Sequence, residues 1–183
     1  MTVLTAPAAG LTDSVVTLRP PSPDAGDAAT VDKYVQDQQL DGAWLPDVPL
    51  VTGAQLVADW TDGWAARPSR NGPAFVVTVS EQSHFIGVVG LNERDEGVVA
   101  ISYGIAPRWR GRGLASQAVR LGSRWIASQS GIHRVEARIS QDNRAGERVA
   151  VNAGFELAET IPPARDTGQA TDDLLYVFAQ SSS

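Results

Sequence analysis

The sequence predicts one α/β domain of the α+β type, with a mixed, mostly antiparallel, strongly twisted sheet of six to seven strands and helices on both faces. Two patterns support this prediction. Three strand-like runs follow one another across short polar turns, and the second half of the chain alternates between helical and strand periodicity. With 183 residues and 43% hydrophobic content, the chain suits one core rather than two.

The domain is expected to span residues 13–180, with loose tails at 1–12 and 181–183, because both ends are small, polar or unpatterned. The chain has no cysteine and only two histidines, His84 and His133. This composition excludes thiolate chemistry, and no metal site is expected. No run is long and apolar enough to cross a bilayer, and no secretory signal is recognisable. We therefore expect a cytoplasmic protein without membrane contact.

In the first half of the chain, a short strand is expected at Val15–Arg19, where two prolines stop it. Asp24 is expected to cap a helix that reaches towards Leu40. Thr52 is expected to cap a second helix, which ends before Pro68. That helix carries apolar residues at three- and four-residue spacings, and its tryptophans are expected in the core or in a cleft wall: Trp60 and Trp64.

The expected antiparallel meander consists of the runs Ala74–Ser80, Phe85–Asn92 and Val98–Ile105. In the third run large residues alternate with small ones, which would let a ligand lie close to one face of the sheet. Pro107 ends this run, because proline cannot donate to the ladder. The small residues of the third run are Ala100, Ser102 and Gly104.

In the second half, the period becomes helical from Leu114 onwards, with two adjacent apolar rows that indicate one broad buried face. A strand is expected at Val135–Ile139, after the stop at Gly131. Asn143 is expected to cap another helix that runs to Gly154. Two further strands complete the sheet: Phe155–Ile161 and Leu174–Ala179.

The segment Arg108–Gly113, RWRGRG, lies between the third strand of the meander and the following helix. Its glycines permit a tight turn, and the uncapped amides of a helix start point outward together. The helix dipole, Arg110 and Arg112 add positive charge, so the turn suits a pyrophosphate. A solvated basic turn is the alternative. The segment has no GKS or GKT ending and does not open a βαβ unit, which disfavours the kinase-like and dinucleotide-binding interpretations.

The net charge of −6 argues against nucleic-acid binding, because such binding draws most of its affinity from basic groups that neutralise phosphates. Nucleic-acid binding through the arginines of the turn is the least favoured alternative. It would give a steep salt dependence with oligonucleotides.

The turn resembles the acetyl-CoA turn of the GNAT acyltransferase superfamily, which has the pattern Q/R-x-x-G-x-G/A, here matched by Arg108, Gly111 and Gly113. The likeness includes SYGIAPRWRGRGLASQAVR at 102–120 and is greatest for the RimJ/RimL-like branch. It implies a GNAT-like fold and an acyl-CoA-dependent N-acyltransferase. The reaction implied is transfer of acetyl from acetyl-CoA to a primary amine, either a peptide N-terminus or a small amine.

The resemblance also implies how the coenzyme binds. The strand before the turn splays from its neighbour and bonds the pantetheine arm, while the turn amides hold the pyrophosphate. Ser116 contacts a phosphate or is simply solvated at the helix start, and Asn143 contacts pantetheine or only caps its helix. No metal is implied. The residues assigned to acetyl-CoA are Ile105, Ala106, Arg108, Arg110, Gly111, Arg112, Gly113, Leu114, Ala115, Ser116 and Asn143.

The catalytic positions depart from the pattern of the family. Where related proteins often carry a glutamate, a serine and a tyrosine, this chain has Ala100, Gly146 and Ala150. The remaining candidates are Glu93, acting through water, and Tyr103, facing the acyl group. The alternatives are a surface charge and a buried structural tyrosine. A coenzyme-A-binding protein with weak or no catalysis is therefore the rival interpretation.

The expected mechanism is direct attack of the amine on the thioester in a ternary complex, with no covalent enzyme intermediate. Holding the two reactants in line can itself supply an effective molarity of about 10⁵ M or more. The amine is expected to enter a cleft lined by the loop at 41–49 and by the helix that contains Trp60 and Trp64. The acceptor, the acyl length and the formation of a homodimer are left open by the sequence.

Overall fold

The computed structural model describes residues 4–22, 26–40, 51–67, 72–79, 85–162 and 172–179. The strands are β1 (Leu11–Thr12), β2 (Val16–Arg19), β3 (Ala74–Val79), β4 (Phe85–Asp95), β5 (Val98–Ile105), β6 (Arg134–Ser140), β7 (Phe155–Ile161) and β8 (Asp173–Phe178). The helices are α1 (Asp27–Leu40), α2 (Gly53–Trp64), the 3₁₀ helix η2 (Pro107–Trp109), α3 (Leu114–Ala127) and α4 (Arg144–Ala153).

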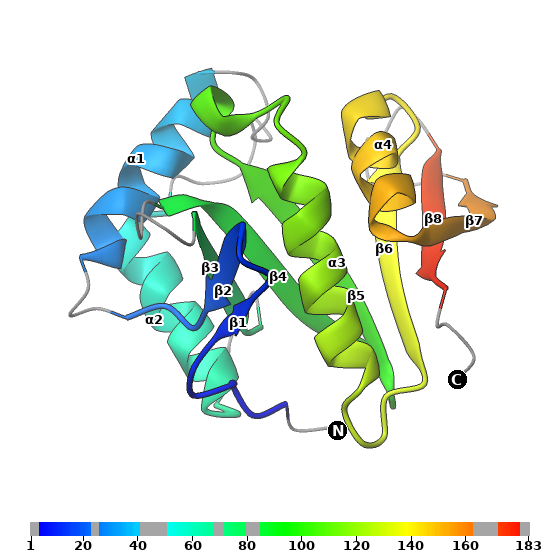
Figure 1. Cartoon of the computed structure of the whole chain (residues 1–183), viewed down its shortest axis with the longest axis horizontal. Helices are drawn as coiled ribbons and strands as arrows, with labels where there is room; N and C mark the ends of the chain where they lie inside the picture. The colour runs from blue at the N-terminus through cyan, green and yellow to red at the C-terminus, as the bar shows by residue number, and fades with distance from the viewer. Residues whose placement is uncertain are drawn as a thin grey trace.

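The strands form one sheet in the order β1-β2-β3-β4-β5-β6-β8-β7, and within it only β5 and β6 pair in parallel. Helices α1 and α2 cover one face, while α3 and α4 cover the other (Figure 1). The predicted α/β class, with a mostly antiparallel mixed sheet and helices on both faces, is confirmed. No helix within the described ranges is long and apolar enough to span a membrane.

The expected number of six to seven strands is wrong by one. The additional strand is β1, whose two residues pair with β2 through Leu11 and Leu18 and through Thr12 and Thr17. It falls inside the segment 1–12 that was expected to be a loose tail. Two residues are too few to show the alternation that marks a strand. The predicted cap Asp24 lies outside the described residues.

Both sheet faces are buried, and β3 shows how its sequence achieves this. Phe75 and Val77 enter the core beneath α3 and α4, whereas Ala74 and Val76 enter the core beneath α1 and α2. Side chains of alternate residues in a strand point to opposite faces. The nearly continuous apolar run of β3 therefore suits a strand covered on both sides.

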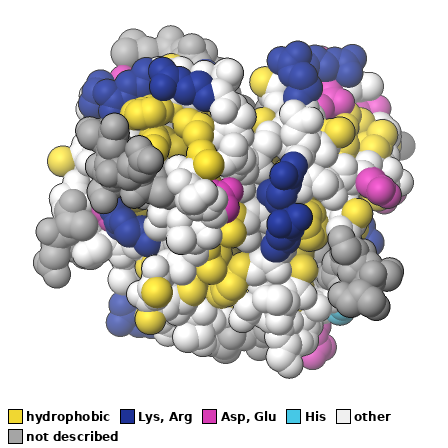
Figure 2. Space-filling model, in the orientation of Figure 1, with side chains coloured by type: hydrophobic (Ala, Val, Ile, Leu, Met, Phe, Trp, Pro, Cys, Tyr) yellow, Lys and Arg dark blue, Asp and Glu magenta, His cyan; other side chains and the backbone are white. Residues whose placement is uncertain are grey.

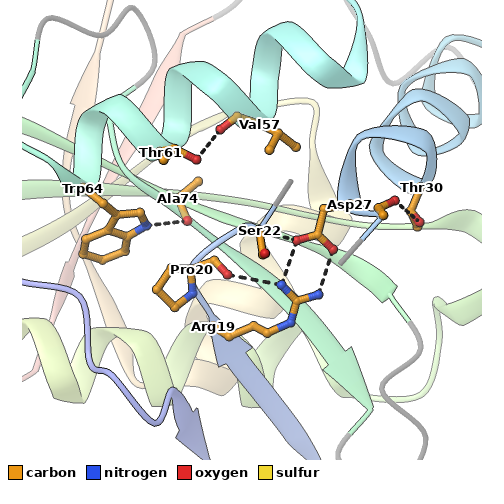
Figure 3. Close-up of polar contacts among 10 residues, drawn as sticks. Arg19, Pro20, Ser22, Asp27, Thr30, Val57, Thr61, Trp64 and Ala74 are labelled. Carbon is orange, nitrogen blue, oxygen red and sulfur yellow. Dashed lines mark hydrogen bonds and ion pairs between the residues drawn. The ribbon is translucent and has the colours of Figure 1, made fainter. Parts of the chain in front are cut away.

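Helix α2 begins and ends as its sequence predicts. Thr52 accepts a hydrogen bond from the amide of Gln55, whose side chain bonds back to the Thr52 amide, which forms a complete capping box. Near the other end, the Trp64 indole donates to the carbonyl of Ala74 at 2.8 Å (Figure 3). The same ring packs against Phe75 and Trp125. These contacts fix α2 to the sheet.

An ion pair joins the end of β2 to the start of α1. Arg19 donates two hydrogen bonds of 2.7 Å to the carboxylate of Asp27, which also accepts from the amide of Ser22 at 2.7 Å (Figure 3). The side chain of Asp27 is only 4% exposed and that of Arg19 is 30% exposed. The carboxylate lies in the first turn of α1, where the helix dipole favours negative charge.

Replacing Asp27→Asn is expected to lower the free energy of unfolding at pH 7 by about 2 kcal/mol, because Arg19 loses a partly buried counter-charge. Burial by itself raises the pKa of Asp27, but the bonds from Arg19 and Ser22 outweigh it and hold the pKa below its usual value. The stabilisation is therefore present above the unfolded-state pKa of about 4. It is lost as the pH falls through the lower pKa of the folded state.

Urea unfolding of both proteins from pH 7 to pH 3 measures this effect. Asp37→Asn is the matched control, since it removes the exposed Lys33–Asp37 pair from the same helix and should cost less than about 0.5 kcal/mol. Equal losses from the two variants, or a gap between wild type and Asp27→Asn that stays constant down to pH 3, would contradict the role of this pair.

Candidate active site

A cleft opens where β5 and β6 diverge. The two strands pair only between Val98–Ala100 and Arg134–Glu136. Beyond Ala100, β6 continues against β8, whereas β5 runs on to Ile105 paired only with β4. A cleft of about 670 Å³ lies beside this open edge, bounded by the end of β5, the turn before α3, and α4. The structure thus shows the divergence that the family resemblance implies.

The turn before α3 presents a row of backbone amides to this cleft. In the described part of the chain, the N–H groups from Gly111 to Ser116 have no protein acceptor, and the first bonded amide is that of Gln117. Gly113 occupies the N-cap and supplies no capping side chain. Free amides at the positive end of a helix dipole form a binding site for an anion.

Both glycines of the turn are required by backbone geometry. The φ angles of Gly111 and Gly113 are 73° and 75°, in the left-handed region that glycine adopts readily. A Cβ atom on either residue would meet nothing within 4 Å. The two glycines are therefore needed for the backbone conformation of the turn, and the space beside them is open to a ligand.

The arginines of the turn have different surroundings. Arg110 folds back onto the sheet: its Nε donates to the carbonyl of Ile105 at 2.9 Å, and its terminal nitrogen donates to Gln38 Oε1 at 2.9 Å. Arg108 and Arg112 lie over the ring of Trp109, with 5.9 and 5.0 Å from guanidinium carbon to ring centroid. All three arginines are exposed, and Arg110 is the one whose side chain is bonded to the end of β5.

Basic side chains line both walls of the opening. Figure 2 shows dark-blue side chains on either side of a hollow at the upper edge of this face, over the turn before α3 and over α4. Arg148 of α4 lines the cleft, together with Arg110 from the other wall. An anionic ligand would therefore meet positive charge on both sides despite the net charge of −6.

The family pattern fits the cleft in a different register from the one expected. Arg108, the arginine to which the pattern was matched, does not line the cleft, and neither does Arg112. The same Q/R-x-x-G-x-G/A spacing also fits two residues later, on Arg110, Gly113 and Ala115. These three residues line the cleft, as do Ile105, Gly111, Leu114 and Ser116.

Tyr103 lies in the cleft, but its hydroxyl is engaged by the protein. It donates a 2.8 Å hydrogen bond to the carbonyl of Gly146 and so links β5 to α4. Burial, and secondarily the neighbouring Tyr176, raise the pKa of Tyr103 above its usual range. Tyr103 is therefore held neutral, with its proton directed at a backbone oxygen. This arrangement agrees with the structural role that was the alternative to catalysis.

Asn143 is the N-cap of α4, and its Oδ1 accepts from the amide of Gly146 at 2.9 Å. It also lines the cleft. A Cβ at Gly146 would lie 2.7 Å from Asn143 Nδ2, closer than real Cβ atoms approach. A larger residue at 146 would therefore require the side chain of Asn143 to shift. Ala150 is fully buried on the face of α4 that packs against the core.

Several residues expected at the site lie outside the cleft. Glu93 is an exposed residue of β4 opposite Val99. The amide of Ala106 donates to Ile86 and its carbonyl accepts from Trp109, which leaves no donor for a coenzyme. Trp60 and Trp64 belong to the packing of α2. The expected acceptor loop at 41–49 lies outside the described residues.

Several cleft residues were missed by the sequence interpretation, among them Tyr34, Gln38 and Trp109. Tyr34 and Gln38, one turn apart on α1, reach the end of β5 from the other face of the sheet. Nothing local in α1 indicates this, because the contact joins segments about 70 residues apart. Trp109 lies within the turn itself, lines the cleft and has a buried Nε1 without a hydrogen-bond partner among the residues that the structure describes. The sequence signal that could have identified Trp109 was its place within the RWRGRG turn.

Comparisons with known proteins agree with this geometry. A family model of the acetyltransferase (GNAT) domain matches residues 16–156, while no curated protein matches the sequence. Among solved structures, the microcin C7 self-immunity acetyltransferase MccE, in complex with acetyl-CoA and AMP, superposes with a TM-score of 0.74 at 17% identity, covering 92% of this chain and 98% of that one.

Two further solved structures show the same fold. RimL, the ribosomal L7/L12 alpha-N-protein acetyltransferase, gives a TM-score of 0.73 at 17% identity, covering 97% of this chain and 94% of that one. A chimera of spermidine N-acetyltransferase SpeG from Vibrio cholerae and hSSAT gives 0.69 at 17% identity, covering 89% and 94%. Since the family match spans most of the sequence, the chain belongs to the GNAT acetyltransferase domain family, whose members use acetyl-CoA, and it is an N-acetyltransferase.

Proposed function

We propose that this chain transfers acetyl from acetyl-CoA to a primary amine, a peptide N-terminus or a small amine, by direct attack in a ternary complex. The row of free amides from Gly111 to Ser116 carries the proposal, because it faces the cleft at the start of α3 and matches the charge of a diphosphate. The chain has no cysteine, so no thiol can form an acyl-enzyme, which favours direct attack.

The residues of the cleft fit the coenzyme in three ways. The turn amides would hold the pyrophosphate, and the open edge of β5 would bond the pantetheine arm. A third donor is the buried indole Nε1 of Trp109, which has no partner among the described residues and would reach a ligand once the ring moves. Acetyl-CoA supplies an acyl group already activated as a thioester. The chain's own residues would orient it, exclude water from it and direct donors towards its oxygen.

For the acceptor, the neighbours support the amine class without choosing among its members. RimL acetylates a protein α-amino group and SpeG acetylates spermidine, by their names. We place the chain near the RimJ/RimL-like branch, on the strength of the motif at 102–120 and of the RimL likeness. The acidic net charge of −6 would favour the approach of cationic amines in general.

Thiol release with acetyl-CoA and a panel of peptides and small amines tests this activity. Direct attack is expected to give intersecting lines in double-reciprocal plots, whereas an acyl-enzyme would give parallel lines. Tight binding of acetyl-CoA with no thiol release across the panel would contradict the proposal.

Ser116→Glu should separate coenzyme binding from stability. Ser116 occupies the third position of α3, where a carboxylate stabilises the helix dipole by about 0.3–1 kcal/mol. The melting temperature should therefore stay level or rise. The same carboxylate competes with the pyrophosphate for the turn amides, so the Kd for acetyl-CoA should increase at least about tenfold. Calorimetric titration and thermal unfolding measure both quantities.

Ser116→Gln is the matched control, because it has the size of glutamate without the charge. It should weaken binding far less than Ser116→Glu does. If both variants bound acetyl-CoA equally well, the pyrophosphate would not lie at the start of α3.

Arg112→Ala tests the exposed charge of the turn. Removing this positive charge from beside the proposed phosphate site should weaken acetyl-CoA binding by about three- to tenfold at low salt, and the difference in Kd should narrow as salt screens the charge. Arg124→Ala, at the far end of the same helix and also exposed, should change the Kd by less than about twofold. Equal increases of the Kd in the two variants would indicate that the net charge of the protein, and not the position of Arg112 in the turn, affects binding.

A further inference from the structure

The hydroxyl of Tyr34 differs from those of the other two tyrosines of the chain. Tyr103 donates to the carbonyl of Gly146, and Tyr176 donates to the carboxylate of Glu147 at 3.1 Å. In the described part of the chain, no hydrogen bond is made by the hydroxyl of Tyr34, although the residue is only 7% exposed. Tyr34 also lines the cleft. A hydroxyl that borders a cleft and has no partner among the described residues is available to a ligand there.

The ring of Tyr34 is held against the strand that forms the cleft wall. It packs edge-on against Phe85, with 5.5 Å between ring centroids. Its hydroxyl occupies the space that a side chain at Gly104 would need, since a Cβ built there collides with the Tyr34 oxygen. Glycine at 104 therefore lets the hydroxyl lie directly against the backbone of β5, from the α1 face of the sheet.

This stretch of β5 is the open edge beyond Ala100. The carbonyl of Ile105 points to that edge, where it accepts from Gln38 Nε2 at 3.2 Å and from Arg110. Backbone groups of alternate residues in a strand point to the same edge, so those of Tyr103 share it. Gln38 is one helical turn after Tyr34. Helix α1 thus anchors itself to the open edge and sets Tyr34 beside it.

We propose that Tyr34 is a catalytic residue whose hydroxyl donates a hydrogen bond to the carbonyl oxygen of the acyl thioester. The inference rests on the proposed function, which runs that thioester along the open edge of β5. When the amine attacks the carbonyl carbon, negative charge gathers on this oxygen, and a fixed donor in a buried site stabilises it. No proton is transferred to or from Tyr34 in this role. The hydroxyl needs only to stay protonated.

The surroundings of Tyr34 suit a donor rather than a base. Burial raises its pKa to about 12, and the nearby Arg110 offsets only part of that effect. The hydroxyl therefore keeps its proton across the pH range of an ordinary assay. Because it has no protein acceptor among the described residues, its proton is available to a ligand, in contrast to that of Tyr103.

Tyr34→Phe is the decisive variant, since it removes one oxygen and keeps the ring. No hydrogen bond among the described residues is lost, so the melting temperature should not fall. In wild type bound to [1-¹³C]acetyl-CoA, the carbonyl resonance should move downfield from its free position, and Tyr34→Phe should lose most of that shift. The value of kcat should drop about tenfold or more, because loss of one such donor typically costs about 10²–10³-fold. The Kd should change much less than kcat.

Tyr176→Phe is the matched control. It removes a hydroxyl that is bonded to Glu147 in α4, so its stability should fall while the carbonyl resonance stays at the wild-type position. An unchanged resonance and an unchanged kcat in Tyr34→Phe would overturn the assignment of Tyr34 and leave the proposed function intact. Failure of wild type to bind acetyl-CoA would overturn both.

Discussion

The cleft depends on the loss of one strand pairing in the middle of the sheet. β5 leaves β6 after Ala100 but remains bonded to β4 along its whole length, so it is held from one side only. β6 keeps a full partner in β8. The divergence therefore exposes the backbone groups of a few residues of β5 without weakening the rest of the sheet. An interior open edge of this kind can take an extended ligand as a substitute strand.

The carbonyl of Ile105 shows how the protein protects that edge. It accepts from Gln38 of α1 and from Arg110 of the turn, and these two side chains also bond to each other. One backbone oxygen thus joins three elements that surround the cleft. Arg110 contributes mainly by fixing the end of the strand, so the anion-binding capacity of the turn comes chiefly from its free amides and the helix dipole.

What the sequence could predict follows from the range of the interactions. The caps at Thr52 and Asn143 and the turn before α3 depend on neighbours within a few residues, and all three form as expected. The contact between Tyr34 and Gly104 could not be predicted in this way, because the two residues are 70 positions apart and belong to a helix and a strand. The strand β1 was not predicted for another reason. Its two residues carry no periodic pattern and gain their structure only from β2.

The positions that lack the usual polar residues have structural reasons to do so. A side chain at Gly146 would press on the capping side chain of Asn143, and Ala150 is fully buried against the sheet. The hydroxyl of Tyr103 donates to the carbonyl of Gly146 and so links β5 to α4. The polar groups on the α4 side of the cleft thus have structural roles. Stabilising an oxygen requires a fixed donor at the right place rather than at a particular sequence position. Helix α1, on the opposite face, supplies such a donor through Tyr34.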